Sequence, residues 1–158
     1  MEQERFSSLD KIIKMGCNVK SLCKFDKRTE VDTFVTKYNK KTKKEEILEF
    51  ANGRGLLNSL AFLSNNKDHK DLAQDINLDS FLGNGFVINF SKFNEDKIKV
   101  TLSWGGEVFK DMLVDTVDKG IVMLEEELCD KKVTDFVDVE DIYASQFIGE
   151  WKSGARRR

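Results

Sequence analysis

Residues 103–127 read SWGGEVFKDMLVDTVDKGIVMLEEE, and this stretch carries most of the information about the fold. Residues 104–106 (WGG) and 118–120 (DKG) are turn signals, because glycine adopts backbone angles that other residues avoid. The apolar runs beside these turns are typical of strands, and the last of them is Ile121 to Leu124. The stretch therefore predicts a strand, a turn, a long strand, a turn and a further strand, all with an acidic exterior.

The flanking residues extend this β pattern, because apolar side chains recur at every second position. Further short strands are predicted at 136–137 and 142–147. Several short strands joined by tight turns indicate a small antiparallel barrel or sandwich. The alternating residues are Phe86, Ile88 and Phe90, then Ile98, Val100 and Leu102, then Val108, Met112 and Val114.

The first half of the chain mixes helical and strand patterns. A helix is predicted over 9–15, followed by strands over 18–25 and 30–38 that are rich in β-branched and aromatic residues. The second of these also fits a helix, with Val31, Phe34, Val35 and Tyr38 on one face, so both readings stay open.

A second helical region is predicted after these strands. Thr42 and Glu45 form an S/T-x-x-E capping pattern before Ile47 and Leu48, which predicts a helix ending near Gly53. A helical period continues over 56–61, and another turn or two is predicted over 68–75. The fold class is therefore α+β, with an α/β portion at 1–84, an SH3/Sm-like β-barrel at 85–150 and a basic tail at 151–158.

The segment KIKVTLSW, the glycine turn and the apolar IVML resemble the start of Sm-like, SH3-type barrels, and VDVEDIYASQF resembles their closing strands. SSLDKIIKMGC, NVKSLCKF, EVDTFVTKY and TKKEEILEF follow the element order of the bacterial ribosome maturation factor family. That resemblance implies an α/β domain before a small barrel, and a binding role. Asp111 stands where Sm-like barrels usually carry glycine, and the chain has no proline for the family's interdomain junction, so no functional residues are transferred.

Charge is distributed unevenly along the 158 residues. Residues 1–44 hold 12 Lys/Arg against 6 Asp/Glu, whereas residues 105–150 hold 4 against 13, although the net charge of the whole chain is only −2. No run approaches the roughly 20 apolar residues of a membrane span, and the first residues lack the order of a signal peptide. We expect a cytoplasmic protein without membrane contact.

Little in the sequence points to catalysis. His69 is the single histidine, and Cys17, Cys23 and Cys129 form no CxxC pair, so zinc binding and His-based acid/base pairs are disfavoured. Residues 52–55 (NGRG) lack the GK[ST] of a phosphate-binding loop. We expect a protein that is not an enzyme, with no catalytic residues, no metal and no cofactor.

Two binding hypotheses remain. The first is RNA or ribonucleoprotein binding, in which lysines supply phosphate-attracting charge and one tyrosine supplies a stacking ring. An acidic barrel would repel RNA, so these contacts fall in the N-terminal half or the tail. The candidate residues are Lys37, Tyr38, Lys40, Lys41, Lys43 and Lys44.

The second hypothesis is a protein-directed inhibitor or adaptor of the phage or mobile-element type, whose acidic surface occupies a basic or nucleic-acid-binding groove of its target. Trp104, Phe109 or Trp151 would anchor the contact, although Trp104 and Phe109 also fit a barrel core. The acidic candidates are Asp111, Asp115, Asp118, Glu125, Glu126 and Glu127.

Overall fold

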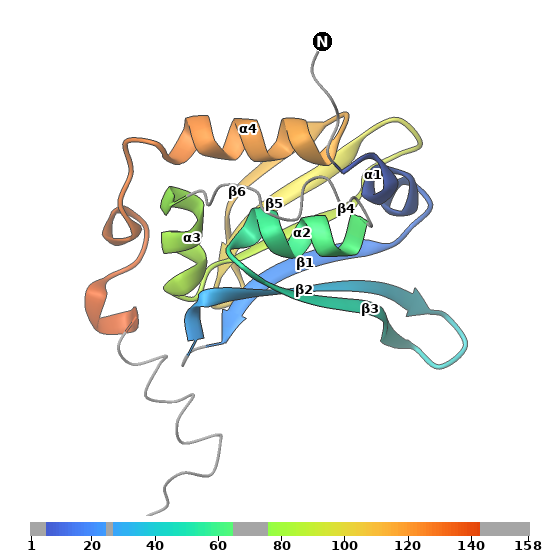
Figure 1. Ribbon diagram of the computed structural model, residues 1–158, viewed down its shortest axis with the longest axis horizontal. Coiled ribbons are helices and arrows are strands. Elements are labelled where there is room, and N and C mark those ends of the chain that lie inside the picture. The colour runs from blue at the N-terminus through green and yellow to red at the C-terminus, as the bar shows by residue number, and fades with distance from the viewer. Residues whose placement is uncertain (1–5, 25–26, 65–75, 143–158) are drawn as a thin grey trace, which may run out of the picture.

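Six antiparallel strands form one open sheet in the order β3-β2-β1-β4-β5-β6 (Figure 1). The computed structural model describes residues 6–24, 27–64 and 76–142. The strands are β1 (Asn18–Lys24), β2 (Lys27–Asn39), β3 (Lys44–Arg54), β4 (Val87–Lys92), β5 (Ile98–Trp104) and β6 (Glu107–Val114). The helices are α1 (Ser7–Lys14), α2 (Leu56–Ser64), α3 (Ile76–Gly83) and α4 (Val117–Leu128), followed by a 3₁₀ turn at Val133–Asp135 and helical residues at 139–142.

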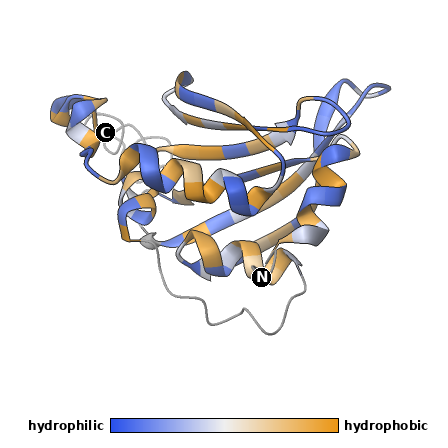
Figure 2. Cartoon of the chain, turned by 90° about the horizontal axis from the view of Figure 1, so that it is seen from above, coloured by the Kyte–Doolittle hydropathy of each residue, from blue (hydrophilic) through white to orange (hydrophobic). Residues whose placement is uncertain are grey.

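The helices lie together on one side of the sheet, and the apolar residues gather between the two layers (Figure 2). Side chains alternate along a strand, and the central strands β1, β4 and β5 bury every second residue over most of their length against the helices. Val19, Ile88, Phe90, Val100 and Leu102 are fully buried on this inner side. The helices, with Phe6 just before α1, add further core residues: Phe6, Leu9, Ile13, Leu56, Leu60, Leu78, Phe81, Leu82, Val117, Ile121, Leu124 and Leu128.

Residues 7–64 and 76–128, where they are described, form two halves with the same order of elements. The first runs α1-β1-β2-β3-α2 and the second α3-β4-β5-β6-α4, and β1 and β4 pair antiparallel at the centre of the sheet. Ser7 to Asn18 and Ile76 to Val87 are equally long segments, so helix and strand begin at matching positions in both halves. The sheet therefore has an approximate two-fold arrangement about the β1–β4 contact.

Matching residues in the two halves have matching roles. Gly16 and Gly85 each end the turn between a helix and the following strand, with φ of 110° and 100°, a region that favours glycine. Asp10 of α1 accepts a hydrogen bond from the backbone N–H of Val117, the first residue of α4, and Asp79 of α3 accepts one from that of Leu56, the first residue of α2. Each half thus caps the last helix of the other.

The α+β class is confirmed, and so are several elements. The predicted helix over 9–15 is α1, the predicted helical period over 56–61 is α2, and 30–38 is strand rather than helix. The alternating segments around residues 88, 100 and 112 are β4, β5 and β6. The helix predicted over 68–75 lies outside the described residues.

The helix predicted from Thr42 is wrong, because residues 44–54 form strand β3 paired with β2. The backbone N–H groups of Lys41 and Thr42 donate to Asn39 Oδ1, and Lys43 takes a positive φ of 60°, so the segment turns back on itself. Asn and Asp side chains favour such turns by binding their own backbone. Glu45 accordingly accepts hydrogen bonds from Thr36 and Asn18 instead of capping a helix.

The closed SH3/Sm-like barrel is not formed, since the predicted strand 121–124 lies within helix α4. Thr116 caps this helix by accepting a hydrogen bond from the Lys119 N–H at 3.1 Å. The buried residues Val117, Ile121, Leu124 and Leu128 follow the helical period, so the strand predicted for this apolar run is wrong. After β6 the chain leaves the sheet, and β3 and β6 remain its two edges.

The C-terminal part also differs from the expectation. Phe136 and Val137 follow the 3₁₀ turn rather than forming a strand. Of the predicted strand 142–147 only Ile142 is described, and it is helical. None of the helices in the described ranges is long and apolar enough to cross a membrane.

Candidate nucleic-acid interface

The outer face of the sheet carries no helix in the described part of the chain, and its side chains differ from those of the inner face. Ser21 and Ile88 point to the helices and are fully buried, whereas their neighbours Lys20 and Asn89 point outward and are half-buried. This outer side, called the open face below, is a surface of mixed polar and aromatic residues. Such a face suits a polar ligand better than an apolar protein partner.

The strand register aligns open-face residues in a row across all six strands. Phe34 and Phe50 at its β3 end have ring centroids 5.1 Å apart, with the ring planes at 46°. At its centre the Asn89 Oδ1 atom is buried and has no hydrogen-bond partner within the described residues. In order from β3 to β6 the row comprises Phe50, Phe34, Lys20, Asn89, Thr101 and Asp111.

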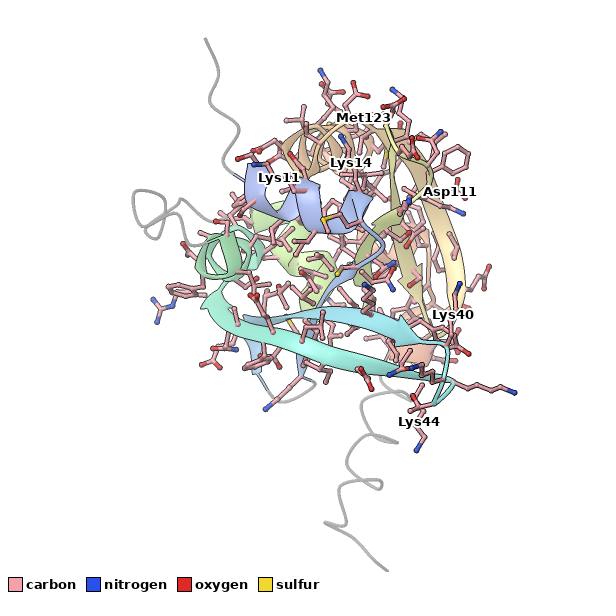
Figure 3. The ribbon with its side chains drawn as sticks, turned by 90° about the vertical axis from the view of Figure 1, so that its right-hand side faces the viewer. Lys11, Lys14, Lys40, Lys44, Asp111 and Met123 are labelled. Carbon is pink, nitrogen blue, oxygen red and sulfur yellow. The ribbon has the colours of Figure 1, made fainter. Side chains whose placement is uncertain are left out.

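The candidate lysines converge at the tip of the β2–β3 hairpin. Lys37 lies on β2, Lys40, Lys41 and Lys43 lie in the turn, and Lys44 begins β3. All five are exposed, and none forms an ion pair within the part of the chain that is described. Figure 3 shows Lys40 and Lys44 at this end of the hairpin, away from Lys11 and Lys14 on α1.

The two carboxylates next to these lysines do not pair with them, because each carboxylate accepts a hydrogen bond from an uncharged side chain. Glu46 Oε2 accepts a hydrogen bond from Asn39 Nδ2 at 3.0 Å, and Glu45 Oε2 accepts one from Thr36 Oγ1 at 2.8 Å. Asn39 also fixes the turn, as described above. The hairpin therefore presents a preformed group of cations, called the lysine tip below and comprising Lys37, Lys40, Lys41, Lys43 and Lys44.

Apolar side chains lie beside the lysine tip. Tyr38 is 54% exposed, and Ile47 and Leu48 are also exposed. A hollow of about 430 Å³ is lined by Tyr38, Leu48, Glu46 and several of the lysines. Tyr38, the predicted stacking ring, therefore lies next to the predicted phosphate-binding lysines, as expected from their neighbouring positions in the sequence.

A second hollow of about 270 Å³ lies further along the same hairpin. Its lining residues are Lys24, Glu30, Asp32, Phe50 and Asn52. Asn52 Nδ2 donates to Asp32 Oδ1 at 2.6 Å, and Asp32 is only 3% exposed. Phe50 joins this hollow to the aromatic end of the open-face row.

The acidic candidates do not form one surface on a sheet. Asp111 lies on β6 at the far edge of the open face, Asp115 precedes α4, and the other four belong to α4 itself. Asp115 pairs with Lys97 at 2.6 Å and Glu127 with Lys110 at 2.8 Å, and these lysines lower the pKa of both carboxyl groups. Asp118 accepts a hydrogen bond from the backbone N–H of Phe6, while Glu125 is half-buried and Glu126 is exposed.

Two of the aromatic anchor candidates take part in packing, and Trp151 lies outside the described residues. Trp104 is half-buried, and its Nε1 donates to the carbonyl of Asn84 at 3.0 Å. Phe109 packs against Phe86 and Phe136 with ring centroids 5.9 and 5.7 Å apart. Both rings therefore take part in packing at the end of the sheet near α3, as expected for core residues.

Groups that could support catalysis or metal binding are dispersed. The described residues contain no group of three or more His, Cys, Asp or Glu side chains that could hold a metal ion, and His69 lies outside them. Burial, with smaller contributions from Asp79 and Asp32, raises the pKa of Cys23 to about 11, so this thiol stays protonated at neutral pH. A protonated thiol is a poor nucleophile.

Phe34, Phe50 and Lys20 belong to the open face but were not among the candidate residues. Strand alternation over 30–38 would have placed Phe34 and Tyr38 on one face once the segment was taken as a strand. Phe50 could not be found in this way because β3 was predicted as a helix. The chain matches no family model, and searches of curated proteins and of solved structures likewise found no match.

Proposed function

We propose that this protein is a non-catalytic RNA-binding protein that holds phosphate groups at the lysine tip and bases on the adjoining open face. The observation that carries the proposal is the lysine tip itself: five exposed lysines without ion pairs among the described residues, on a turn fixed by Asn39. Clustered cations bind phosphates by releasing the counterions that surround a nucleic acid.

The separation of charge favours this proposal despite a sequence pI of about 5.6. Four of the acidic candidates lie on α4, whereas the lysine tip ends the β2–β3 hairpin. Interactions between exposed charges fade over the Debye length of about 8 Å at physiological salt, so local charge matters more than net charge. RNA bound at the tip would therefore experience five lysines and the two neighbouring carboxylates of Glu45 and Glu46, which leaves a net positive local charge.

A charge reversal tests the proposal. Changing Lys40, Lys41, Lys43 and Lys44 to Glu should weaken RNA binding, measured by fluorescence anisotropy, by more than about tenfold at moderate salt and should flatten the dependence of log Kd on log salt. The matched control changes four exposed lysines elsewhere, Lys11, Lys92, Lys119 and Lys131, and alters net charge equally. Equal losses in both variants would show that binding follows net charge and would contradict the proposal.

The RNA-binding measurements also bear on the second class of function, an inhibitor or adaptor whose acidic residues bind a basic protein. Wild-type protein that binds no RNA at low salt would contradict the RNA proposal. Capture of a basic protein that survives nuclease and is lost on changing Glu126 and Glu127 to Lys would then favour the adaptor function.

A further inference from the structure

The hollow formed by Lys24, Glu30, Asp32, Phe50 and Asn52 has the features of a site for one planar ring. Its volume of about 270 Å³ is below the 300–1,000 Å³ typical of pockets that enclose whole drug-sized ligands. It lies on the open face, because Asp32 pairs with Asn52, and Phe34 with Phe50, on the side that the helices leave uncovered. A ring entering it would remain attached to a chain outside.

Phe50 supplies a wall for such a ring. Its side chain is 53% exposed, and Phe34 supports it from the adjacent strand at 5.1 Å. A large exposed phenyl ring held in place by a second ring is a stacking surface that a base can use without rearrangement of the protein. Base stacking of this kind requires an unpaired base, which favours a single-stranded ligand.

The polar edge of the hollow selects the kind of ring. Asp32 is almost fully buried, and its Oδ1 is already bound by Asn52 Nδ2 at 2.6 Å, so the carboxylate is fixed in direction. A carboxylate is an acceptor only, with room for several donors on its two oxygens. The exocyclic amino groups of adenine, cytosine and guanine are donors, whereas uracil presents only carbonyl oxygens at its exocyclic positions.

Charge excludes the alternative that a phosphate enters the hollow. Glu30 and Asp32 are both acidic and would repel a phosphate at close range. Lys24 at the rim and Lys20 beside Phe34 can attract the backbone outside the hollow. Tyr38 at the lysine tip lies about 20 Å from Asp32 along β2, at roughly 3.3 Å per residue.

We infer that this hollow binds one nucleobase carrying an exocyclic amino group, from a single-stranded RNA whose phosphates are held by the lysine tip. The base stacks on Phe50 and donates its amino group to the Asp32 carboxylate. The inference rests on the proposed RNA-binding function and adds to it the strandedness of the ligand and a preference against uracil.

Anisotropy titrations with oligoadenylate, oligocytidylate and oligouridylate of equal length test the inference. The wild-type protein should bind the first two roughly tenfold more tightly than oligouridylate, and should bind a duplex of the same length less tightly than oligoadenylate. Asp32→Asn should remove most of this preference, because an amide can also donate to the uracil carbonyl. The control Asp130→Asn changes an exposed carboxylate that follows α4, outside the open face, and should leave the preference unchanged.

A second variant, at the exposed Phe50, tests the site without changing a buried side chain. Phe50→Leu should weaken binding of all three oligonucleotides roughly tenfold, while Phe62→Leu should leave it unchanged. The control is matched, because Phe62 on α2 is 50% exposed and Phe50 is 53% exposed. Thermal unfolding of each variant establishes that it is folded.

The outcomes separate the two proposals. Equal affinity of the wild-type protein for the three oligonucleotides, or no effect of Phe50→Leu, would overturn the base site while loss of binding on reversing the lysine tip still supported RNA binding. No binding of any oligonucleotide would overturn both.

Discussion

The carboxylate of Asp10 in α1 accepts a hydrogen bond from the backbone N–H of Val117 at 2.7 Å, which joins α1 to α4. Asp79 and Leu56 form the same contact at 2.9 Å between α3 and α2. The first N–H groups of a helix have no partner within it, so these aspartates stabilise helices that lie far from them in sequence. The helix layer is thereby linked across the two halves.

Asp10→Ala should lower the free energy of unfolding by about 2 kcal/mol, because it removes the acceptor for a helix N-terminus at a buried position. Urea unfolding followed by circular dichroism measures the change. The control Asp130→Ala alters an exposed aspartate just after α4 and should change little. Equal stability of the Asp10 variant and the control would show that the contact does not support the fold.

A chain of buried hydroxyl groups connects the sheet to α2. Thr33 Oγ1 lies 2.7 Å from both Ser21 Oγ and Ser59 Oγ, and all three residues are fully buried. Thr33→Val should cost about 2 kcal/mol, because it removes the central partner of two buried hydroxyl groups. Chemical denaturation tests this against Thr101→Val on the open face. A loss in the control as large as that at Thr33 would refute the assignment.

Gly120 lets α4 approach the sheet closely. A Cβ atom there would lie 2.8 Å from Val100 Cγ2 and 3.2 Å from Phe90 Cε2, and both neighbours are fully buried. Alanine raises helix propensity by about 1 kcal/mol, but overpacking a buried contact costs about 1–3 kcal/mol. We expect Gly120→Ala to be destabilising by about 1 kcal/mol in thermal unfolding. A raised melting temperature would mean that helix and sheet are less tightly packed.

Cys23 and Cys129 should react with an alkylating reagent at different rates near neutral pH. Burial first, and the carboxylates of Asp79 and Asp32 second, raise the pKa of Cys23 from 9.0 to about 11, whereas Cys129 is exposed. Because the pKa of Cys23 is higher in the folded than in the unfolded protein, its contribution to the free energy of unfolding is fully present below pH 9.0. That contribution is lost as the pH rises through about 11. Alkylation at pH 8, followed by mass spectrometry, should modify Cys129 first.

Unfolded protein provides the reference for this experiment, since all thiols should then react at similar rates. Alkylation of Cys23 as fast as that of Cys129 in the folded protein at pH 8 would contradict the raised pKa.

Sequence patterns predicted those elements whose residues follow one period and whose ends carry ordinary signals. α1, α2 and the strands β1, β2, β4, β5 and β6 belong to this group. β3 was missed because Thr42 and Glu45 match a helix-capping pattern, while the turn is determined by Asn39, a residue outside that pattern. α4 was missed because a short apolar run fits both periods, and only the packing of Val117 and Leu128 distinguishes them.

The two-fold arrangement of the halves also left a signal in the sequence. Leu9-Asp10 precedes Gly16 as Leu78-Asp79 precedes Gly85, with the same spacing. The role of these aspartates could not be predicted, because their hydrogen-bond partners lie in the opposite half. For the candidate site, proximity in sequence was enough for the lysine tip, whereas the acidic candidates were adjacent in sequence but are divided between β6 and α4.

Photochemical cross-linking to bound RNA, with mass-spectrometric identification of the adducts, shows directly whether RNA lies on the hairpin and the open face as we propose. We predict adducts on Phe34, Tyr38 and Phe50, the aromatic residues of that surface. They should disappear when the lysine tip is changed to Glu. Adducts confined to the helix layer, for example on Phe62, or adducts that survive the charge reversal, would contradict the account.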